Sequence, residues 1–318
     1  MSYTGPGFDP PQPRRSRRGP LTVALAALVP GALLGWAVYA AVGGSGGDEG
    51  SGGASASASG TPSAGASPSA GADDTKPGAS ASAKSPSASA PAGSGALKGK
   101  VVVIDPGHNP GNFRHTADIN RQVDIGTNRK ECDTTGTATN DGYAEAEFTL
   151  DVAHRMRTLL ERQGATVKLT QDADRPFGPC VDERARIGNK AKADAVVSIH
   201  ADGSGTGNRG FHVILPGAVH SGAADTRAIV EPSGDLGERI AGNFVRATGS
   251  APSNYIGGGT GLVTREDLGG LNLSTVPKVF IECGNMRDSK DAALLTSGAW
   301  RQKAAQGISD GIVGFLRG

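Results

Sequence analysis

The stretch Val101-Val-Val-Ile-Asp-Pro-Gly-His108 combines a buried-strand pattern with an abrupt stop. Its β-branched residues predict a core strand over 100–104, and Asp-Pro-Gly ends that strand so that His108 follows directly. In open α/β sheets, ligands bind at the carboxyl ends of the strands. The octet therefore predicts a strand that delivers His108 to a binding edge, although a core strand followed by an ordinary turn and a surface histidine has the same pattern.

Two more predicted strands end in a group that can bind a metal or move a proton. The strand 195–199 precedes His200, and the strand 277–281 precedes Glu282. Parallel strands end at one edge, and Glu145, at the start of a predicted helix, can reach the same edge. Two imidazoles and a carboxylate form a zinc-hydrolase ligand set, and a further carboxylate can take the proton of a bound water.

The hydrophobic periodicity predicts one α/β domain with a mostly parallel twisted sheet flanked by helices. Strands that alternate with helices are typical of a parallel sheet covered on both faces. Further helices are expected over 145–163, 181–193, 234–248, 288–296 and 299–316, and further strands over 166–170, 210–215 and 262–264.

The segment 109–142 is too long for a simple connection, so a flap or hairpin near the site is expected there. It carries Arg114, Arg121 and Arg129. These arginines are candidate contacts for an acidic substrate, or parts of a lid over the site.

The chain before residue 98 differs in composition from the rest. Residues 1–19 are basic and rich in Pro and Gly, and 20–42 form an apolar run without a charged residue, long enough to cross a bilayer. The arginines before this run predict that everything after it is exported, with an uncleaved anchor favoured and a cleavable signal peptide as the alternative. Residues 43–97, dominated by Gly, Ser, Ala, Pro and Thr, predict a disordered tether, and 98–318 form one folded domain.

The charge balance excludes one class of partner. Lys and Arg number 32 against 31 Asp and Glu, and aromatic residues make up 4% of the chain. Phosphate binding calls for a basic excess or stripe, which the folded part lacks, so no nucleic-acid partner is expected.

The cysteines are Cys132, Cys180 and Cys283, and none forms a Cys-x-x-Cys pair. A cysteine zinc site is therefore not expected. Cys132 and Cys180 lie in loop-like sequence, whereas Cys283 follows a hydrophobic strand and should be buried. In an exported domain we expect a Cys132–Cys180 disulfide, with three reduced thiols as the alternative.

Four short blocks contain the polar residues described above. They are Asp-Pro-Gly-His at 105–108, Glu145 with Phe-Thr-Leu-Asp-Val-Ala at 148–153, Ser-Ile-His-Ala-Asp at 198–202, and Pro-Lys-Val-Phe-Ile-Glu-Cys-Gly-Asn at 277–285. In order and spacing they resemble the signature blocks of the zinc-dependent N-acetylmuramoyl-L-alanine amidases of the amidase-3 type, across nearly all of 99–317.

This resemblance implies an amidase-3-like catalytic domain over 98–318, similar in fold to zinc exopeptidases. It implies that His108, Glu145 and His200 ligate one Zn²⁺ ion and that Glu282 is the catalytic carboxylate. Members of the family cleave the amide between N-acetylmuramic acid and the L-alanine of the stem peptide. The implied substrate is therefore peptidoglycan or its muropeptide fragments.

The acidic block departs from the family pattern because Glu145-Ala-Glu147 offers two candidate ligands. Alignment of Leu150 and Ala153 with the family's helix selects Glu145, and Glu147 is expected about 200° around the helix. Two other stretches, 139–143 and 178–184, resemble a subgroup found in high-GC Gram-positive bacteria, in which two loop cysteines form a disulfide.

Two alternative functions remain at this point. One is a zinc exopeptidase of related fold, and the other is a non-catalytic peptidoglycan-binding or regulatory module. Whichever function applies, we expect an extracytoplasmic monomer, attached to the membrane through its N-terminal segment or secreted to the cell wall, and an activator protein is a candidate partner.

The other polar residues are interpreted more plainly. His154 and His212 are expected to be structural histidines, and Cys283 is expected to be a core residue. Arg265 and Asp267 follow a predicted strand end, where a surface ion pair is the default and contact with a substrate carboxylate is the alternative.

Overall fold

The computed structural model describes residues 95–318. The predicted basic tail 1–19, apolar segment 20–42 and nearly all of the tether 43–97 lie outside the described residues. Within 95–318, none of the helices is both long and apolar enough to cross a bilayer.

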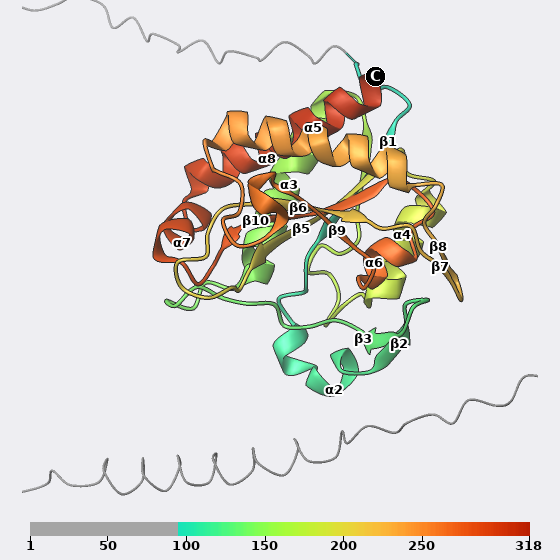
Figure 1. The fold of residues 1–318 in the computed structure, drawn as a ribbon, viewed down its shortest axis with the longest axis horizontal. Helices are drawn as coiled ribbons and strands as arrows, with labels where there is room; N and C mark the ends of the chain where they lie inside the picture. Colours follow the sequence, from blue (N-terminus) through green and yellow to red (C-terminus); the bar gives the residue numbers. More distant parts are fainter. Residues whose placement is uncertain (1–94) are drawn as a thin grey trace, which may run out of the picture. The chain divides into compact units, whose positions relative to one another are not determined.

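A six-stranded sheet forms the centre of the domain, in the order β4-β1-β5-β10-β6-β9 (Figure 1). All neighbouring pairs are parallel except β10 and β6. The predicted α/β class with a mostly parallel sheet is therefore confirmed. The strands are β1 (Val101–Pro106), β4 (Thr166–Leu169), β5 (Ala195–Asp202), β6 (His212–Pro216), β9 (Leu262–Arg265) and β10 (Lys278–Asn285).

One face of the sheet is covered by three long helices, and Figure 1 shows two of them, α5 and α8, side by side. Alternate residues of β1, β5 and β10, such as Ile104, Val197 and Ile281, point into this layer and are fully buried. The main core therefore forms where the apolar face of the strands, made by every second residue, packs against the apolar faces of the helices, which repeat every 3.6 residues. The helices are α3 (Glu145–Arg162), α5 (Val230–Thr248) and α8 (Gly298–Arg317).

The opposite face of the sheet is partly polar. Val103 and Val196 pack against α4 (Val181–Ala191), whereas Asp105, Ser198 and Lys278 from neighbouring strands are buried on the same side. Because side chains alternate along a strand, this polar face belongs to the same strands that build the main core. It leads directly to the carboxyl ends of β1, β5 and β10.

The segment after β1 contains the predicted hairpin. β2 (Gln122–Asp124) and β3 (Arg129–Glu131) pair antiparallel, after a short 3-10 helix η1 (Asn112–Arg114) and a single-turn helix α2 (Thr116–Ile119). Ile125 at the hairpin turn packs closely against Gly269 in α6 (Gly269–Asn272). The hairpin is thereby docked on the polar side of the sheet, a position that the sequence pattern did not define.

The predicted disulfide is confirmed. Cys132 and Cys180 are bonded, and Cys283 is buried and free. The bond joins the end of the hairpin to the residue that precedes α4. It therefore ties the long insertion to the sheet-covering helix.

Several predicted boundaries move by a few residues. The strands of β5 and β10 continue past His200 and Glu282, so that both side chains project from within a strand rather than from a following turn. The helix expected to begin at Gly234 begins at Val230. The remaining described elements are short: β7 (His220–Ser221), β8 (Ala224–Asp225), η2 (Gly257–Gly259) and α7 (Ser289–Leu295).

Candidate active site

His108 is held in an uncommon backbone conformation at the end of β1. Its φ is +62°, in the left-handed region that non-glycine residues seldom adopt. Its carbonyl oxygen accepts hydrogen bonds from Gln171 (3.0 Å) and Arg184 (2.9 Å), which stabilise that conformation. Nδ1 donates to the Thr134 carbonyl at 3.1 Å. Because a carbonyl only accepts, the neutral ring has its proton on Nδ1 and its lone pair on Nε2.

His200 is oriented by a chain of two hydrogen bonds. The Ser198 hydroxyl lies 2.9 Å from Oδ2 of Asp105 and 3.2 Å from Nε2 of His200. The ionised carboxylate accepts only, so the hydroxyl donates to Asp105 and accepts from Nε2 of His200. The lone pair of the neutral His200 ring is therefore on Nδ1, the atom that faces Glu145.

Close packing around His200 explains the glycine in the first signature block. A Cβ atom at Gly107 would lie 2.4 Å from Cε1 of His200. On the neighbouring strand, the Phe280 ring stacks on the imidazole at a centroid distance of 5.2 Å. The imidazole is thus confined by β1 and β10 as well as by its own strand.

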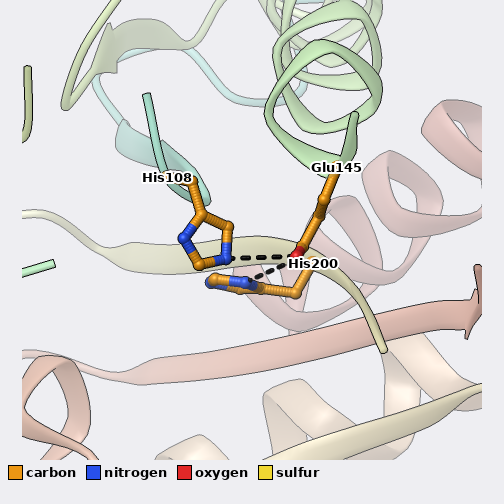
Figure 2. A group of neighbouring side chains, drawn as sticks. All are labelled: His108, Glu145 and His200. Atoms are coloured by element: carbon orange, nitrogen blue, oxygen red, sulfur yellow. Dashed lines mark hydrogen bonds and ion pairs between the residues drawn. The ribbon is translucent and has the colours of Figure 1, made fainter. Parts of the chain in front are cut away.

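Glu145, in the first turn of α3, lies between the two histidines, as Figure 2 shows. Oε2 is 3.2 Å from Nε2 of His108, and Oε1 is 3.0 Å from Nδ1 of His200. Backbone N–H groups of Thr137 and Ala201 also donate to this carboxylate. Glu145 is 4% exposed, whereas Glu147 is exposed to solvent.

The three side chains form a group suited to a metal ion. One ligand atom from each of His108, Glu145 and His200 lies within 4.8 Å of the others. The structure thus brings together the three residues singled out in sequence, with Nε2 of His108 and Nδ1 of His200 both facing the same carboxylate. Two imidazoles and one carboxylate are a donor set that fits zinc and leaves a position open.

The charges of this group depend on one another. Burial by itself would raise the pKa of Glu145, but His108 and His200 lower it well below its usual range. Burial by itself would lower the pKa of His108, but Glu145 and Asp133 raise it well above its usual value. The carboxylate therefore stays ionised, as an anionic metal ligand must.

Glu282 lies beside this group. It is in register with His200 on the adjacent parallel strand, and it lines the same cleft. Its Oε2 atom is buried and has no hydrogen-bond partner among residues 95–318. Burial, and then the negative charges of Glu145 and Asp202, raise the pKa of Glu282 well above its usual value. A carboxyl group with a raised pKa is suited to accept and return a proton near neutral pH.

A buried network of ion pairs lies next to the site, on the polar face of the sheet. Asp105 is fully buried and contacts Lys278 Nζ at 3.0 Å, Arg184 at 2.8 Å and the Thr170 hydroxyl at 2.7 Å. Burial by itself would raise the pKa of Asp105, but Lys278 and Arg184 hold it well below its usual value.

Arg184 extends the network toward the first histidine. It also contacts Asp133 at 2.9 Å, and Asp133 lies 3.4 Å from Nδ1 of His108. Burial would raise the pKa of Asp133, but Arg184 and His108 lower it to about 2. The buried positive charge of Arg184 is therefore matched by two carboxylates.

Sequence reasoning did not identify this network. Asp105 and Arg184 lie inside quoted motifs, and Asp133 directly follows Cys132, so each was adjacent to a recognised feature. In the sequence, the one available sign of an internal ion pair was a lysine within a predicted hydrophobic strand, since buried lysines are almost always paired. In the structure that lysine, Lys278, is 1% exposed.

The other singled-out residues occupy distinct positions. Arg265 lines the cleft and pairs with Asp267 through two contacts of 2.8 and 2.6 Å. His212 is buried opposite Glu282 on β6, and its Nδ1 has no partner in the described part of the chain. His154 pairs with Asp172 near the surface.

The flap arginines lie apart from the cleft lining. Arg114 lies over the Phe113 ring, Arg121 donates to the Cys180 sulfur, and Arg129 donates to the Gln122 carbonyl. Lys130, the next residue of the hairpin, does line a cavity that adjoins the cleft.

The fold and this polar cluster together are those of an α/β amide hydrolase. The chain belongs to the N-acetylmuramoyl-L-alanine amidase family, whose model matches residues 102–313. Enzymes of this family generally depend on a metal ion. Hydrolysis of an amide in peptidoglycan is the activity that this membership supports.

Similar proteins come from several bacteria. N-acetylmuramoyl-L-alanine amidase Rv3717 of Mycobacterium tuberculosis is 40% identical over 237 residues, which cover 74% of this chain and 94% of the relative. LytC of Bacillus subtilis is 25% identical, over 69% of this chain and 36% of its own length. The crystal structure of Ami1 from Mycobacterium smegmatis is 41% identical with a TM-score of 0.63, over 69% of this chain and 98% of Ami1. AmiC2 of Nostoc punctiforme, at 22% identity and a TM-score of 0.51 over 69% of this chain and 98% of AmiC2, shares the fold.

Proposed function

We propose that this chain cleaves the amide between N-acetylmuramic acid and L-alanine, with one Zn²⁺ ion held by His108, Glu145 and His200. The observation that carries the proposal is the meeting of these three side chains in one cleft with Glu282. The donor chemistry fits zinc, because two neutral imidazoles and one carboxylate leave an open coordination position.

The roles of the residues follow from their surroundings. A bound zinc ion would polarise the scissile carbonyl and make a water more acidic. Glu282 accepts the proton of the attacking water and returns it to the nitrogen of L-alanine as the C–N bond breaks. The repulsion from Glu145 that raises the pKa of Glu282 would be offset by a cation held by His108, Glu145 and His200.

Ser198 and Thr134 act on the ligand rings. The hydroxyl of Ser198 keeps Nδ1 of His200 unprotonated, and the carbonyl of Thr134 does the same for Nε2 of His108. Such partners orient metal-binding histidines and raise their basicity. The two rings therefore need little rearrangement to bind an ion.

The alternative functions receive less support. A two-metal exopeptidase needs further carboxylate ligands, and residues 95–318 contain one group of three or more potential ligands. A non-catalytic module would be expected to lack one of the chemical residues, and here both histidines and both glutamates are in place.

The cellular setting is also proposed. We place the domain outside the cytoplasmic membrane, with 20–42 as an anchor or signal segment and 43–97 as a tether. The Cys132–Cys180 disulfide supports this, because such bonds persist in oxidising compartments. Similarity to cell wall amidases supports it as well. Mycobacterial relatives at 40–41% identity support membership of the high-GC Gram-positive subgroup.

Metal content and turnover measured on one preparation test this proposal. The full-length chain should contain one equivalent of zinc and release L-alanyl peptide from a muramoyl peptide. A chelator should stop release, and zinc should restore it. His200→Ala should lose both zinc and turnover, whereas His154→Ala, which changes a histidine outside the cleft, should keep both. Full turnover by the chelated protein would contradict the proposal.

A further inference from the structure

An open groove adjoins the proposed metal cleft. It has a volume of about 320 Å³, and its walls include Phe113, Thr135, Thr137 and Ala138. Among the described residues that line it, none carries a charge. The volume is within the range of small-molecule sites, so the groove is large enough for one ring-sized group.

The groove is continuous with the cleft. Gly136 and Thr137 line both cavities. A Cβ atom at Gly136 would lie 2.8 Å from Cδ2 of His108 and 2.9 Å from Oε2 of Glu145, so this backbone passes directly over the candidate metal ligands. A substrate held with its scissile bond at the cluster can therefore extend past Gly136 into the groove.

Phe113 gives the groove an exposed aromatic wall. Its side chain is 63% exposed, and Val245 on α5, at 40%, is the other large exposed hydrophobic residue in 95–318. The guanidinium of Arg114 lies 4.9 Å from the centre of the Phe113 ring. An exposed aromatic ring beside a functional cleft is a feature of ligand-binding surfaces.

The charges of the two cavities differ. The cleft wall is charged, with Arg265 beside the carboxylates of Glu145, Asp202 and Glu282, whereas the groove offers hydroxyl groups, backbone and an aromatic ring. Arg265, which is also paired with Asp267, is the cationic group of the cleft wall that suits a substrate carboxylate. The two parts of the substrate that flank the proposed scissile amide differ in charge, as the two cavities do. The stem peptide carries carboxylates, and the N-acetylated sugar is neutral once its lactyl carboxyl is in the amide.

We propose that this groove binds the N-acetylated pyranose ring on the muramoyl side of the amide, with Phe113 stacked on the ring. This inference rests on the proposed function, and it sets the direction in which the substrate lies across the metal ligands. The sugar lies over 135–138, and the peptide lies on the side of the cleft that contains Arg265.

Two substrates that differ only in the sugar test the proposal. One is an N-acetylmuramoyl tripeptide, and the other is a D-lactoyl tripeptide of the same sequence, which keeps the scissile amide but lacks the pyranose. Phe113→Ala in the full-length chain should lower kcat/KM for the first roughly tenfold through a higher KM. The second substrate should be cleaved at the wild-type rate.

Two further variants complete the design. Phe113→Trp should retain the preference for the sugar, and Val245→Ala, the matched exposed control, should change neither rate. Unchanged turnover of the lactoyl peptide shows that Phe113→Ala is folded. An equal loss on both substrates, or no loss on the muramoyl peptide, would overturn the sugar subsite while leaving amide hydrolysis intact. Failure of the wild-type protein to cleave either substrate would overturn the proposed function itself.

Discussion

The hydroxyl of Ser198 lies 3.2 Å from Nε2 of His200, two residues further along the same strand. Residues i and i+2 of a strand project from one face, so this contact follows from the pleat of β5. Because the same hydroxyl donates to a buried carboxylate, it can only accept from the imidazole. The strand therefore carries both a candidate ligand and the group that sets its tautomer.

Ser198→Ala should weaken zinc binding roughly tenfold, because Nδ1 and Nε2 of His200 then compete for the proton. Stability should fall by about 2–3 kcal/mol, because the substitution removes a hydrogen bond to a buried carboxylate as well as the one from the imidazole. Competition with a chromogenic chelator measures the affinity. Ser309→Ala is a matched control, because Ser309 is also buried and its hydroxyl has no partner in the described part of the chain. Equal zinc affinity in the two variants would contradict the orienting role.

Glu282→Gln should lower kcat by about 10³-fold or more while zinc content stays at the wild-type level. The amide keeps the shape of the side chain but cannot accept the proton of the attacking water. Single-turnover assays and metal analysis of the same sample separate the two effects. Glu147→Gln, on the solvent side of α3, should be unaffected. Loss of zinc from the Glu282 variant would instead indicate a ligand role.

Asp105→Asn should destabilise the protein by roughly 3–5 kcal/mol, because it leaves the buried charges of Lys278 and Arg184 without their common partner. Urea unfolding at neutral pH measures this loss. Asp235→Asn, at a surface ion pair with Arg239, should cost less than 1 kcal/mol. A change of similar size in both variants would count against the network.

The same carboxylate predicts how stability depends on pH. The folded state holds the pKa of Asp105 below its ordinary value of 3.8. Its contribution is therefore complete above about pH 4 and is lost as the pH falls further, since the unfolded chain takes up the proton first. The Asn variant should show a flatter acid limb than the wild-type protein. Parallel acid limbs would assign acid unfolding to other groups.

Cys132→Ser together with Cys180→Ser should lower the free energy of unfolding by about 2–4 kcal/mol, because the bond closes a loop with a sequence separation of 48 residues. Thermal unfolding with and without a reductant measures the effect. Cys283→Ser changes a buried free thiol and keeps the disulfide, so a reductant should lower its stability by the same amount as it lowers that of the wild type. A double variant as stable as the oxidised wild type would show that the hairpin needs no covalent tie.

The site residues that could be predicted from the sequence are those that directly follow a predicted strand. His108, His200 and Glu282 each follow a hydrophobic run, and parallel pairing brings such positions to one edge. The helix start at Glu145 was equally visible in the periodicity of α3. These features are local, and the rule that joins them is general, so the class of fold and the meeting of the four side chains were predictable.

The remaining parts depend on contacts between distant residues. Lys278 and Asp105 are separated by 173 positions, and neither flanking pattern indicates that the two side chains meet. The reversal of β6 against β10, and the docking of Ile125 on Gly269, depend on packing in the same way. The neutral groove beside Phe113 is a property of the folded surface, because residues from three separate segments form it.

The position of the cleaved bond tests the central claim most directly. Purified peptidoglycan should be digested with the full-length chain, with and without a chelator, and the products analysed by mass spectrometry. The account predicts release of intact stem peptides with a free L-alanine amino group, lost on chelation and restored by zinc. Products cut within the peptide, or the same products in the presence of the chelator, would contradict it.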